Sequence, residues 1–231
     1  MNKILATYNF GSKVAGYDTP SSDTDVGEVR YYGLASFISL NPSKRNTPKN
    51  STEKTKTGDK EILDYANFLQ QVMNPNPNLH AKIMTLTPTS DHFWVTDYRY
   101  VLDEFIYWRS YIYRCISFVD NLPNTIKGTV QAIYTLSLVL NQIDNNIYCV
   151  DPKWWHFDSS TLIYKCVSDR NSLTDNGDDD KNFITYWQTQ VSLVKEILNK
   201  SPKLDAEDVR YNERENFLLD ILEMFITLEN R

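Results

Sequence analysis

Glycine, cysteine and histidine are scarce in this chain, and each scarcity excludes a class of protein. Only 7 of the 231 residues are glycine, which excludes collagen-like and glycine-rich low-complexity chains. The three cysteines (Cys115, Cys149 and Cys166) lie far apart without a Cys-x-x-Cys pair, so we expect neither a structural zinc site nor a disulfide framework. The three histidines also lack the spacing of zinc ligands.

The sequence also lacks an excess of basic residues and a long apolar run. It contains 24 Lys and Arg against 30 Asp and Glu, a net charge of −6. This balance excludes a strongly basic nucleic-acid coat but leaves a local basic patch open. No apolar stretch approaches the roughly 20 residues that span a bilayer, and the N-terminal apolar run is too short for a signal peptide. We therefore expect a soluble cytoplasmic protein with no membrane partner.

What is present divides the chain into three regions. Residues 1–32 predict a strand, a Gly-Ser turn, a loop and a second strand, because residues 23–32 alternate between polar and apolar side chains. Residues 43–58 form a polar loop rich in lysine, which is either a solvated linker or a contact for nucleic-acid phosphates. The remainder of the chain is predicted to be mainly helical.

The helical region begins at Asp64, which is expected to cap its first helix. Apolar residues then recur every three or four positions, as on the buried face of a helix. Residues 149–167 are aromatic and β-branched and predict a β-rich segment. The acidic run 175–180 lacks the ligand spacing of an EF-hand, so we do not expect calcium there. Helices are predicted at residues 65–73, 79–84, 97–121, 127–141, 182–199 and 205–228.

Two closely spaced carboxylates are the first sign of chemistry. Asp23 and Asp25 are two residues apart, so on a strand both would point to the same face. Like charges this close repel unless a cation neutralises them, and Mg²⁺ prefers carboxylate oxygens together with substrate phosphates. The pair therefore predicts a Mg²⁺ site, which Mn²⁺ could also occupy. Two such ions could stabilise both the attacking and the leaving oxygen of an in-line displacement.

The turn before these carboxylates is suited to phosphate. Gly11 allows a ligand to approach the backbone closely, and Ser12 offers both a hydroxyl and a backbone N–H. A short helix beginning there would add a favourable dipole, and Lys13 would add a point charge. The segment predicts a phosphate cradle, although it is not a Walker A loop, because GxxxxGK[ST] is absent.

The stretch from Gly11 to Val26 resembles the signature of DNA polymerase β-type nucleotidyltransferases. It is more similar still to the predicted nucleotidyltransferases that are associated with RNA ligases and are common in bacteriophages. Residues 4–80 carry the resemblance, with Ala15 in place of an aromatic residue and His80 in place of a common Glu. The matching positions are Gly11-Ser12, Gly16, Thr19-Pro20, Ser22-Asp23, Asp25 and Asn76-Pro77-Asn78.

The resemblance implies a nucleoside triphosphate donor and a set of site residues. The implied third carboxylate is Asp59 on a neighbouring strand, and Glu61 is the alternative, because it would lie on the same strand face. The implied triphosphate-binding residues are Gly11, Ser12 and Lys13, and the implied catalytic and metal-binding residues are Asp23, Asp25 and Asp59.

The resemblance also implies a fold and a partner. The fold class is α+β: residues 1–95 would form a small mixed β-sheet of the polymerase β palm-like type that bears the catalytic site. Residues 96–231 would form a mainly helical domain that makes the other wall of the cleft. The implied acceptor is an RNA end, tRNA first, with a protein or a small molecule less favoured. The protein would act in the cytoplasm, or in the host cytoplasm if it comes from a phage.

A second function class uses the same scaffold without catalysis. Such a protein would bind another protein or sequester nucleotides. The two classes differ in one observable: the non-catalytic class is favoured if neither Asp59 nor Glu61 approaches the pair of Asp23 and Asp25.

Overall fold

The chain forms two compact units, each described here by itself. The sheet unit comprises Met1–Val14, Asp18–Phe105 and Val209–Arg231, and the helical unit comprises Ala15–Tyr17 and Ile106–Asp208. The chain first passes between the units after Phe105, and residues 209–231 belong to the sheet unit, whereas the predicted domains are 1–95 and 96–231. The catalytic role of the first domain and the cleft-wall role of the second stay predictions. A computed structural model describes residues 3–19, 22–33, 51–91, 93–150, 162–173, 177–205 and 207–229.

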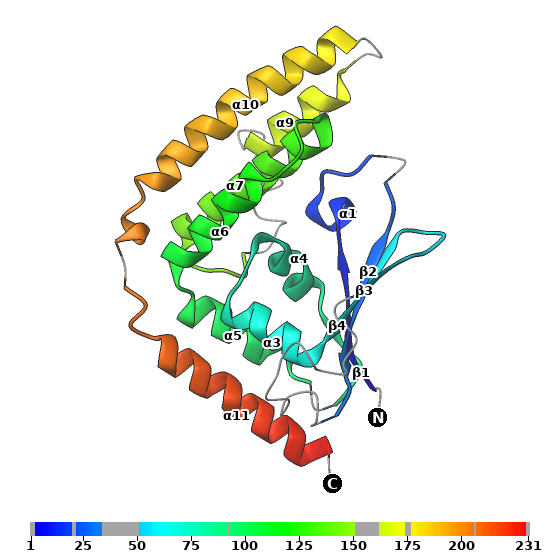
Figure 1. The fold of residues 1–231 in the computed structure, drawn as a ribbon, viewed down its shortest axis with the longest axis vertical. Coiled ribbons are helices and arrows are strands. Elements are labelled where there is room, and N and C mark those ends of the chain that lie inside the picture. Colours follow the sequence, from blue (N-terminus) through cyan, green and yellow to red (C-terminus); the bar gives the residue numbers. More distant parts are fainter. Residues whose placement is uncertain are drawn as a thin grey trace. The chain divides into compact units, whose positions relative to one another are not determined.

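A five-stranded mixed β-sheet is the centre of the sheet unit (Figure 1). The strand order is β3-β4-β2-β1-β5, with β2 and β4 parallel and the other neighbours antiparallel. The two strands predicted before residue 33 are confirmed. Strand β3 falls in the predicted polar loop, where Ser-Thr-Glu-Lys has no apolar residue to signal an edge strand. The strands are β1 Lys3–Phe10, β2 Asp25–Tyr31, β3 Ser51–Lys54, β4 Asp59–Asp64 and β5 Thr87–Pro88.

One face of the sheet carries an apolar row under three helices. Ala6, Val29 and Leu63 lie in register on β1, β2 and β4 and are fully buried. Helices α3 and α4 contact these strands, and α5 packs on both helices (Figure 1). Burial of each large aliphatic side chain contributes about 1.5–3 kcal/mol, so this row anchors the sheet. The helices are α3 Tyr65–Met73, α4 Pro77–Thr85 and α5 Val95–Phe105.

The starts of α3 and α4 use different caps. Asp64 precedes α3 in extended conformation, as predicted, but its side chain makes no capping hydrogen bond. Asn76 caps α4 by accepting the N–H of Asn78 at 2.9 Å, and Pro77 occupies the first turn, where its missing N–H costs nothing.

An aromatic cluster joins the C-terminal helix α11, Tyr211–Glu229, to the sheet unit. Phe225 of α11 packs edge-on against Tyr31 and Tyr65, and the Tyr65 and Tyr98 hydroxyls lie 2.6 Å apart. Aromatic pairs of this geometry add about 0.5–1.5 kcal/mol beyond the burial of their area. The cluster therefore explains why the last helix belongs with the sheet.

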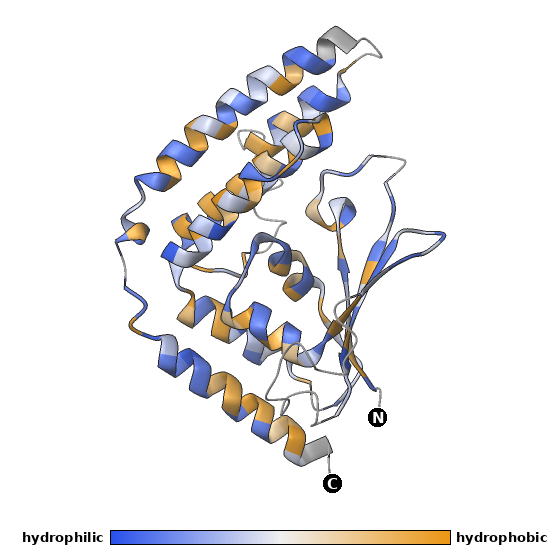
Figure 2. Ribbon diagram, in the orientation of Figure 1, coloured by the Kyte–Doolittle hydropathy of each residue, from blue (hydrophilic) through white to orange (hydrophobic). Residues whose placement is uncertain are grey.

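The helical unit is built around one buried helix, α7, which α6, α9 and α10 contact. Residues 128–139 of α7 are buried almost all round, and the middle of this helix is coloured mainly as hydrophobic in Figure 2. By contrast, α10 buries one face and alternates in hydropathy, as a surface helix does. The helices are α6 Trp108–Asp120, α7 Ile126–Asn145, α9 Leu162–Asn171 and α10 Gly177–Asn199, with a 3₁₀ turn at Pro202–Leu204.

Two predicted elements are wrong. Residues 97–121 form two helices rather than one, because α5 ends at Phe105, whose carbonyl oxygen accepts a hydrogen bond of 2.6 Å from Arg214 of α11. The second half of the predicted β-rich segment is helix α9, which buries Ile163 and Cys166 three positions apart; the first half, residues 151–161, lies outside the described residues. Among the described helices, none combines the length and apolarity needed to cross a membrane.

Candidate functional site

The ends of three adjacent strands bring predicted site residues together. Phe10 ends β1 and pairs with Asp25, the first residue of β2. Val26 pairs with Lys60 in parallel register, which places Asp59, the first residue of β4, beside Asp25. The Asp59 backbone N–H donates to Asp25 Oδ1 at 2.9 Å. We call Phe10, Asp25 and Asp59 the edge row, because they share one end and one face of the sheet.

Two glycines flank the Asp25 carboxylate. A β-carbon at Gly11 would lie 2.1 Å from Asp25 Oδ2, and one at Gly58 would lie 3.1 Å from Asp25 Oδ1. Both glycines have positive φ, +82° and +151°, which other residues rarely adopt. Both positions therefore require glycine, because a side chain at Gly11 would collide with the Asp25 carboxylate and one at Gly58 with the Thr24 carbonyl. Sequence analysis selected Gly11 and missed Gly58, although a glycine directly before a candidate acid was a usable signal.

A short helix, α1, follows Gly11 and spans Ser12–Ala15. The exposed Lys13 side chain reaches back, and its Nζ donates to Thr24 Oγ1 at 2.9 Å. The Thr24 backbone N–H donates to the Thr57 carbonyl at 2.8 Å. The residue between the two predicted aspartates is thus tied to the Gly-Ser turn on one side and to the β3–β4 turn on the other.

Asp23 does not share a strand with Asp25. Strand β2 begins at Asp25, so the alternation expected of a strand does not orient the exposed Asp23 side chain. Among the residues that the structure describes, no three acidic, histidine or cysteine side chains are grouped closely enough to hold a metal ion. The structure brings Asp25 and Asp59 together, whereas Asp23 lies before β2 and is exposed.

Basic residues of the predicted polar loop have different positions. Lys54 pairs in register with Asp59 and is exposed, as is Lys56 in the β3–β4 turn. Lys60 lies on the opposite face of the sheet, where its Nζ is 2.6 Å from Glu28 Oε1. The remaining basic residues of the loop, Lys44, Arg45 and Lys49, lie outside the described residues.

Glu61, the alternative third carboxylate, is bound within a second row. It is in register with Gly27 and Tyr8, one step nearer the core on the same face; we call these three the inner row. The Tyr8 hydroxyl donates to Glu61 Oε2 at 2.9 Å, and Lys82 Nζ of α4 lies 2.7 Å from Oε2 and 2.9 Å from Oε1. Burial, with the charge of Glu61, raises the pKa of Tyr8, so its phenol stays a donor.

Sequence analysis missed Tyr8 and Lys82. Their side chains meet Glu61 only because β1 and α4 pack on the same face of the sheet. The signal that could have found Lys82 is its place on the apolar face of α4, between the fully buried Leu79 and Ile83. A lysine at such a position needs a buried partner.

The acids of these strands differ in their partners. Glu28 pairs with Arg30 and Lys60; although its burial favours the protonated acid, hydrogen bonds from Lys60 and Arg30 lower its pKa. Among the described residues, no lysine or arginine forms an ion pair with Asp25 or Asp59. The edge row therefore offers two carboxylates that the fold has not neutralised.

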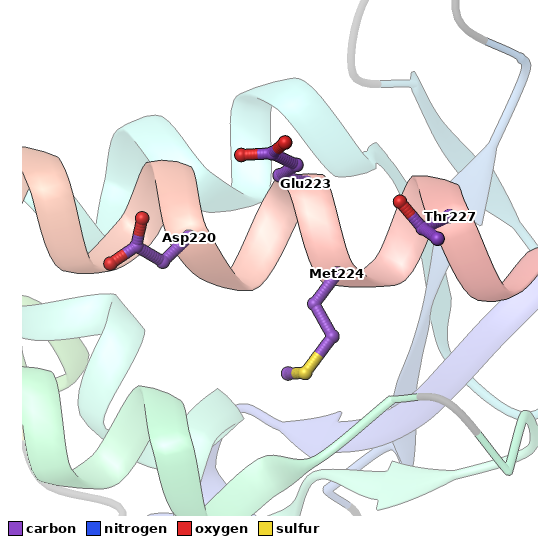
Figure 3. Close-up of a pocket in the computed structure, with 4 residues that line it drawn as sticks. All are labelled: Asp220, Glu223, Met224 and Thr227. Carbon is purple, nitrogen blue, oxygen red and sulfur yellow. The ribbon is translucent and has the colours of Figure 1, made fainter.

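A shallow hollow elsewhere in the sheet unit does not suit the same chemistry. Its volume is about 310 Å³, and its lining residues lie on successive turns of α11 (Figure 3). None of them is basic, so the hollow has no charge to attract a phosphate. The lining residues are Asp220, Glu223, Met224 and Thr227.

The comparisons with known proteins found no family model and no curated protein that matches the chain significantly. A function can therefore be proposed only from the site residues, their geometry and the resemblance of residues 4–80.

Proposed function

We propose that this protein is a Mg²⁺-dependent nucleotidyltransferase that transfers a nucleoside monophosphate from a nucleoside triphosphate to an acceptor hydroxyl. One observation supports this most: the Gly11 turn, Asp25 and Asp59 meet at one edge of the sheet, with the Asp59 N–H bound to the Asp25 carboxylate. The sequence resemblance supplies the reaction, and the α+β fold with its mixed sheet is compatible with it.

The edge row fits a magnesium ion. Mg²⁺ in proteins is held by one or two carboxylates together with waters and substrate phosphates. Asp25 and Asp59 provide two carboxylates that form no ion pair among the described residues, and Gly11 places backbone rather than a side chain beside Asp25 Oδ2. A second ion of a two-metal reaction would need the exposed Asp23. When bound, Mg²⁺ or Mn²⁺ supplies charge neutralisation and Lewis acidity at the phosphates.

The residues of the chain would bind and orient the reactants. The Gly11 backbone and the Ser12 hydroxyl and N–H would hold the triphosphate, and the Lys13 ammonium would balance its charge. The acceptor oxygen forms a bond to the α-phosphorus in line with the bond that breaks, and pyrophosphate leaves. Positioning and charge neutralisation supply most of the catalysis in such a transfer.

An RNA end, tRNA first, is the proposed acceptor, ahead of a protein or a small molecule. The exposed Lys54 and Lys56 lie at the β3–β4 turn, which borders Asp25 through Gly58. Lysines in this position suit contacts with the phosphates of a nucleic acid.

The non-catalytic alternative is supported by one observation, the absence of a three-carboxylate group among the described residues. Against it, the β4 strand does approach Asp25, through the Asp59 backbone. The enzyme is therefore the proposal, and a protein that binds nucleotides or another protein is the alternative.

A labelling experiment tests the proposal. Each α-³²P-labelled nucleoside triphosphate is incubated with the protein, Mg²⁺ or Mn²⁺, total RNA and lysate protein. Asp25→Asn and Asp59→Asn are compared with Asp144→Asn, an exposed acid on α7 that serves as the matched control. Label in RNA that both site variants lose and Asp144→Asn retains would support the proposal.

The other outcomes separate the alternatives. Label on protein or on a small molecule would keep the reaction and change the acceptor. Triphosphate binding without transfer would favour the non-catalytic alternative. If the protein neither bound a triphosphate nor transferred label, the proposed enzyme would be refuted.

A further inference from the structure

We infer that Lys82 is a positioning residue of the candidate site: with Tyr8, it holds Glu61 in an ion pair directly behind Asp25 and Asp59 and keeps this third carboxylate out of the cation site. This inference rests on the proposed function. It assigns a role to a helix residue that neither the Gly-Ser turn nor the Asp-x-Asp motif includes.

The register of the sheet brings Glu61 close to the edge row. Glu61 follows Asp59 by two positions on β4, so both side chains leave the same face about 7 Å apart. The Tyr8 ring lies over Gly27, since a β-carbon there would be 2.2 Å from the ring. The ring therefore crosses β2 and reaches Glu61 from β1, which links all three central strands in one row.

Lys82 neutralises Glu61 at short range. Its Nζ contacts both carboxylate oxygens, and its side chain is only 8% exposed. The ammonium also lies 5.6 Å from the centre of the Tyr8 ring, a distance typical of a cation–π contact. Lys82 thus contacts both oxygens of Glu61, and the Tyr8 hydroxyl contacts one of them. The carboxylate cannot turn toward the edge row without losing these contacts.

Helix α4 is itself fixed to the strand that leads into the site. Thr85 Oγ1 accepts the N–H of Asn9 at 3.0 Å and donates to the carbonyl of Asn9 at 2.7 Å. Asn9 lies two residues before Gly11. The helix that supplies Lys82 is thus held in a set position relative to the Gly-Ser turn.

The charges of Lys82 and Glu61 cancel. Removing one charge or the other should therefore change divalent-cation affinity in opposite directions. Removing the lysine charge leaves Glu61 negative about 7 Å along β4 from Asp59 and should tighten divalent-cation binding roughly tenfold at low salt. Removing the Glu61 charge leaves Lys82 positive and should weaken binding by a similar factor. Removing both should restore the wild-type affinity.

The test measures Mn²⁺ binding to the full chain by titration, with free Mn²⁺ read from its electron paramagnetic resonance signal. The variants are Lys82→Met, Glu61→Gln and the double variant, with Lys82→Arg as the charge-preserving control. Asp25→Asn identifies the site by abolishing binding. We expect Lys82→Met to bind Mn²⁺ more tightly than the wild type and Glu61→Gln to bind it more weakly. The double variant and Lys82→Arg should bind it with near wild-type affinity.

Several outcomes would overturn the inference, and they differ from failure of the proposed function. If the wild type binds Mn²⁺ and Asp25→Asn abolishes that binding, the cation site is supported. If the affinities of Lys82→Met and Glu61→Gln then shift in the same direction or do not shift, the role of Lys82 is refuted. If Lys82→Met does not fold, the direction of the change in Mn²⁺ affinity of Glu61→Gln decides: an affinity that is unchanged or higher refutes the role of Lys82. No Mn²⁺ binding by the wild type would refute the cation site and the inference together.

Discussion

Gly11→Ala should destabilise the protein far more than the same change at Gly33, although both glycines have positive φ. At Gly33, φ is +100° and a new β-carbon would meet nothing within 4 Å. Only backbone strain remains there, about 1–2 kcal/mol for an alanine in this conformation. At Gly11, φ is +82° and the β-carbon would lie 2.1 Å from Asp25 Oδ2. The carboxylate must therefore move by more than an ångström.

That movement would break the hydrogen bond from the Asp59 N–H to Asp25 Oδ1, which is 2.9 Å long. Hydrogen bonds to charged groups contribute about 1.5–3 kcal/mol. The sum of strain and lost bond is about 2.5–5 kcal/mol for Gly11→Ala, against about 1–2 kcal/mol for Gly33→Ala. In an Asp25→Ala background the clash is absent, and Gly11→Ala should cost no more than Gly33→Ala does.

Urea unfolding of the four variants measures these free energies, provided that the m-value stays constant. The double-mutant cycle between residues 11 and 25 isolates their interaction. Equal losses for Gly11→Ala and Gly33→Ala would refute the close contact with Asp25. A Gly11→Ala loss that persists in full without the Asp25 carboxylate would refute it as well.

Further predictions concern the site and the core. Asp59→Asn should stabilise the protein in the absence of divalent cations by roughly 0.5–1 kcal/mol, because it relieves the repulsion with Asp25, and it should remove any rise in melting temperature that Mn²⁺ produces; a loss of stability would contradict an unneutralised pair. Gly27→Ala should displace the Tyr8 ring and cost about 2–4 kcal/mol in urea unfolding, whereas an unchanged stability would refute the contact. Gln142→Leu should cost about 2–3 kcal/mol, since it leaves the buried Tyr111 hydroxyl and Tyr148 carbonyl without the partner they share. Burial raises the pKa of Cys166 to about 12 from 9.0, so its contribution is full below pH 9 and is lost as the pH rises toward 12; Cys166→Ala should flatten the fall in unfolding free energy over that window.

The part of the fold that sequence reasoning found is the part with local signals. Strands β1 and β2 alternate in polarity, and Gly11-Ser12 marks the turn that follows β1. Helix α3 begins directly after Asp64 and ends at Met73, before the Asn- and Pro-rich segment 74–78. In each case the pattern lies within a few residues, so one short stretch of sequence contains all the information that is needed.

The parts that were missed depend on contacts between distant residues. The choice between Asp59 and Glu61 requires the parallel register of β2 and β4, which no local pattern specifies. The end of α5 depends on Arg214, which is supplied by a helix more than a hundred positions later. The position of Lys82 on the apolar face of α4 indicates burial, but its partner Glu61 is identified only once α4 is packed on the sheet.

The acids of β2 and β4 differ in whether a basic side chain neutralises them. Glu28 and Glu61 lie within the strands, and each is neutralised by a basic residue, as a partly buried carboxylate requires. Asp25 and Asp59 lie at the strand ends, adjacent to each other, with backbone rather than ammonium groups around Asp25. Asp25 accepts the Asp59 N–H, but no basic side chain among the described residues forms an ion pair with either acid to offset the repulsion between them. Their repulsion is the kind of local cost that a binding site imposes, and a divalent cation is the ligand that would relieve it.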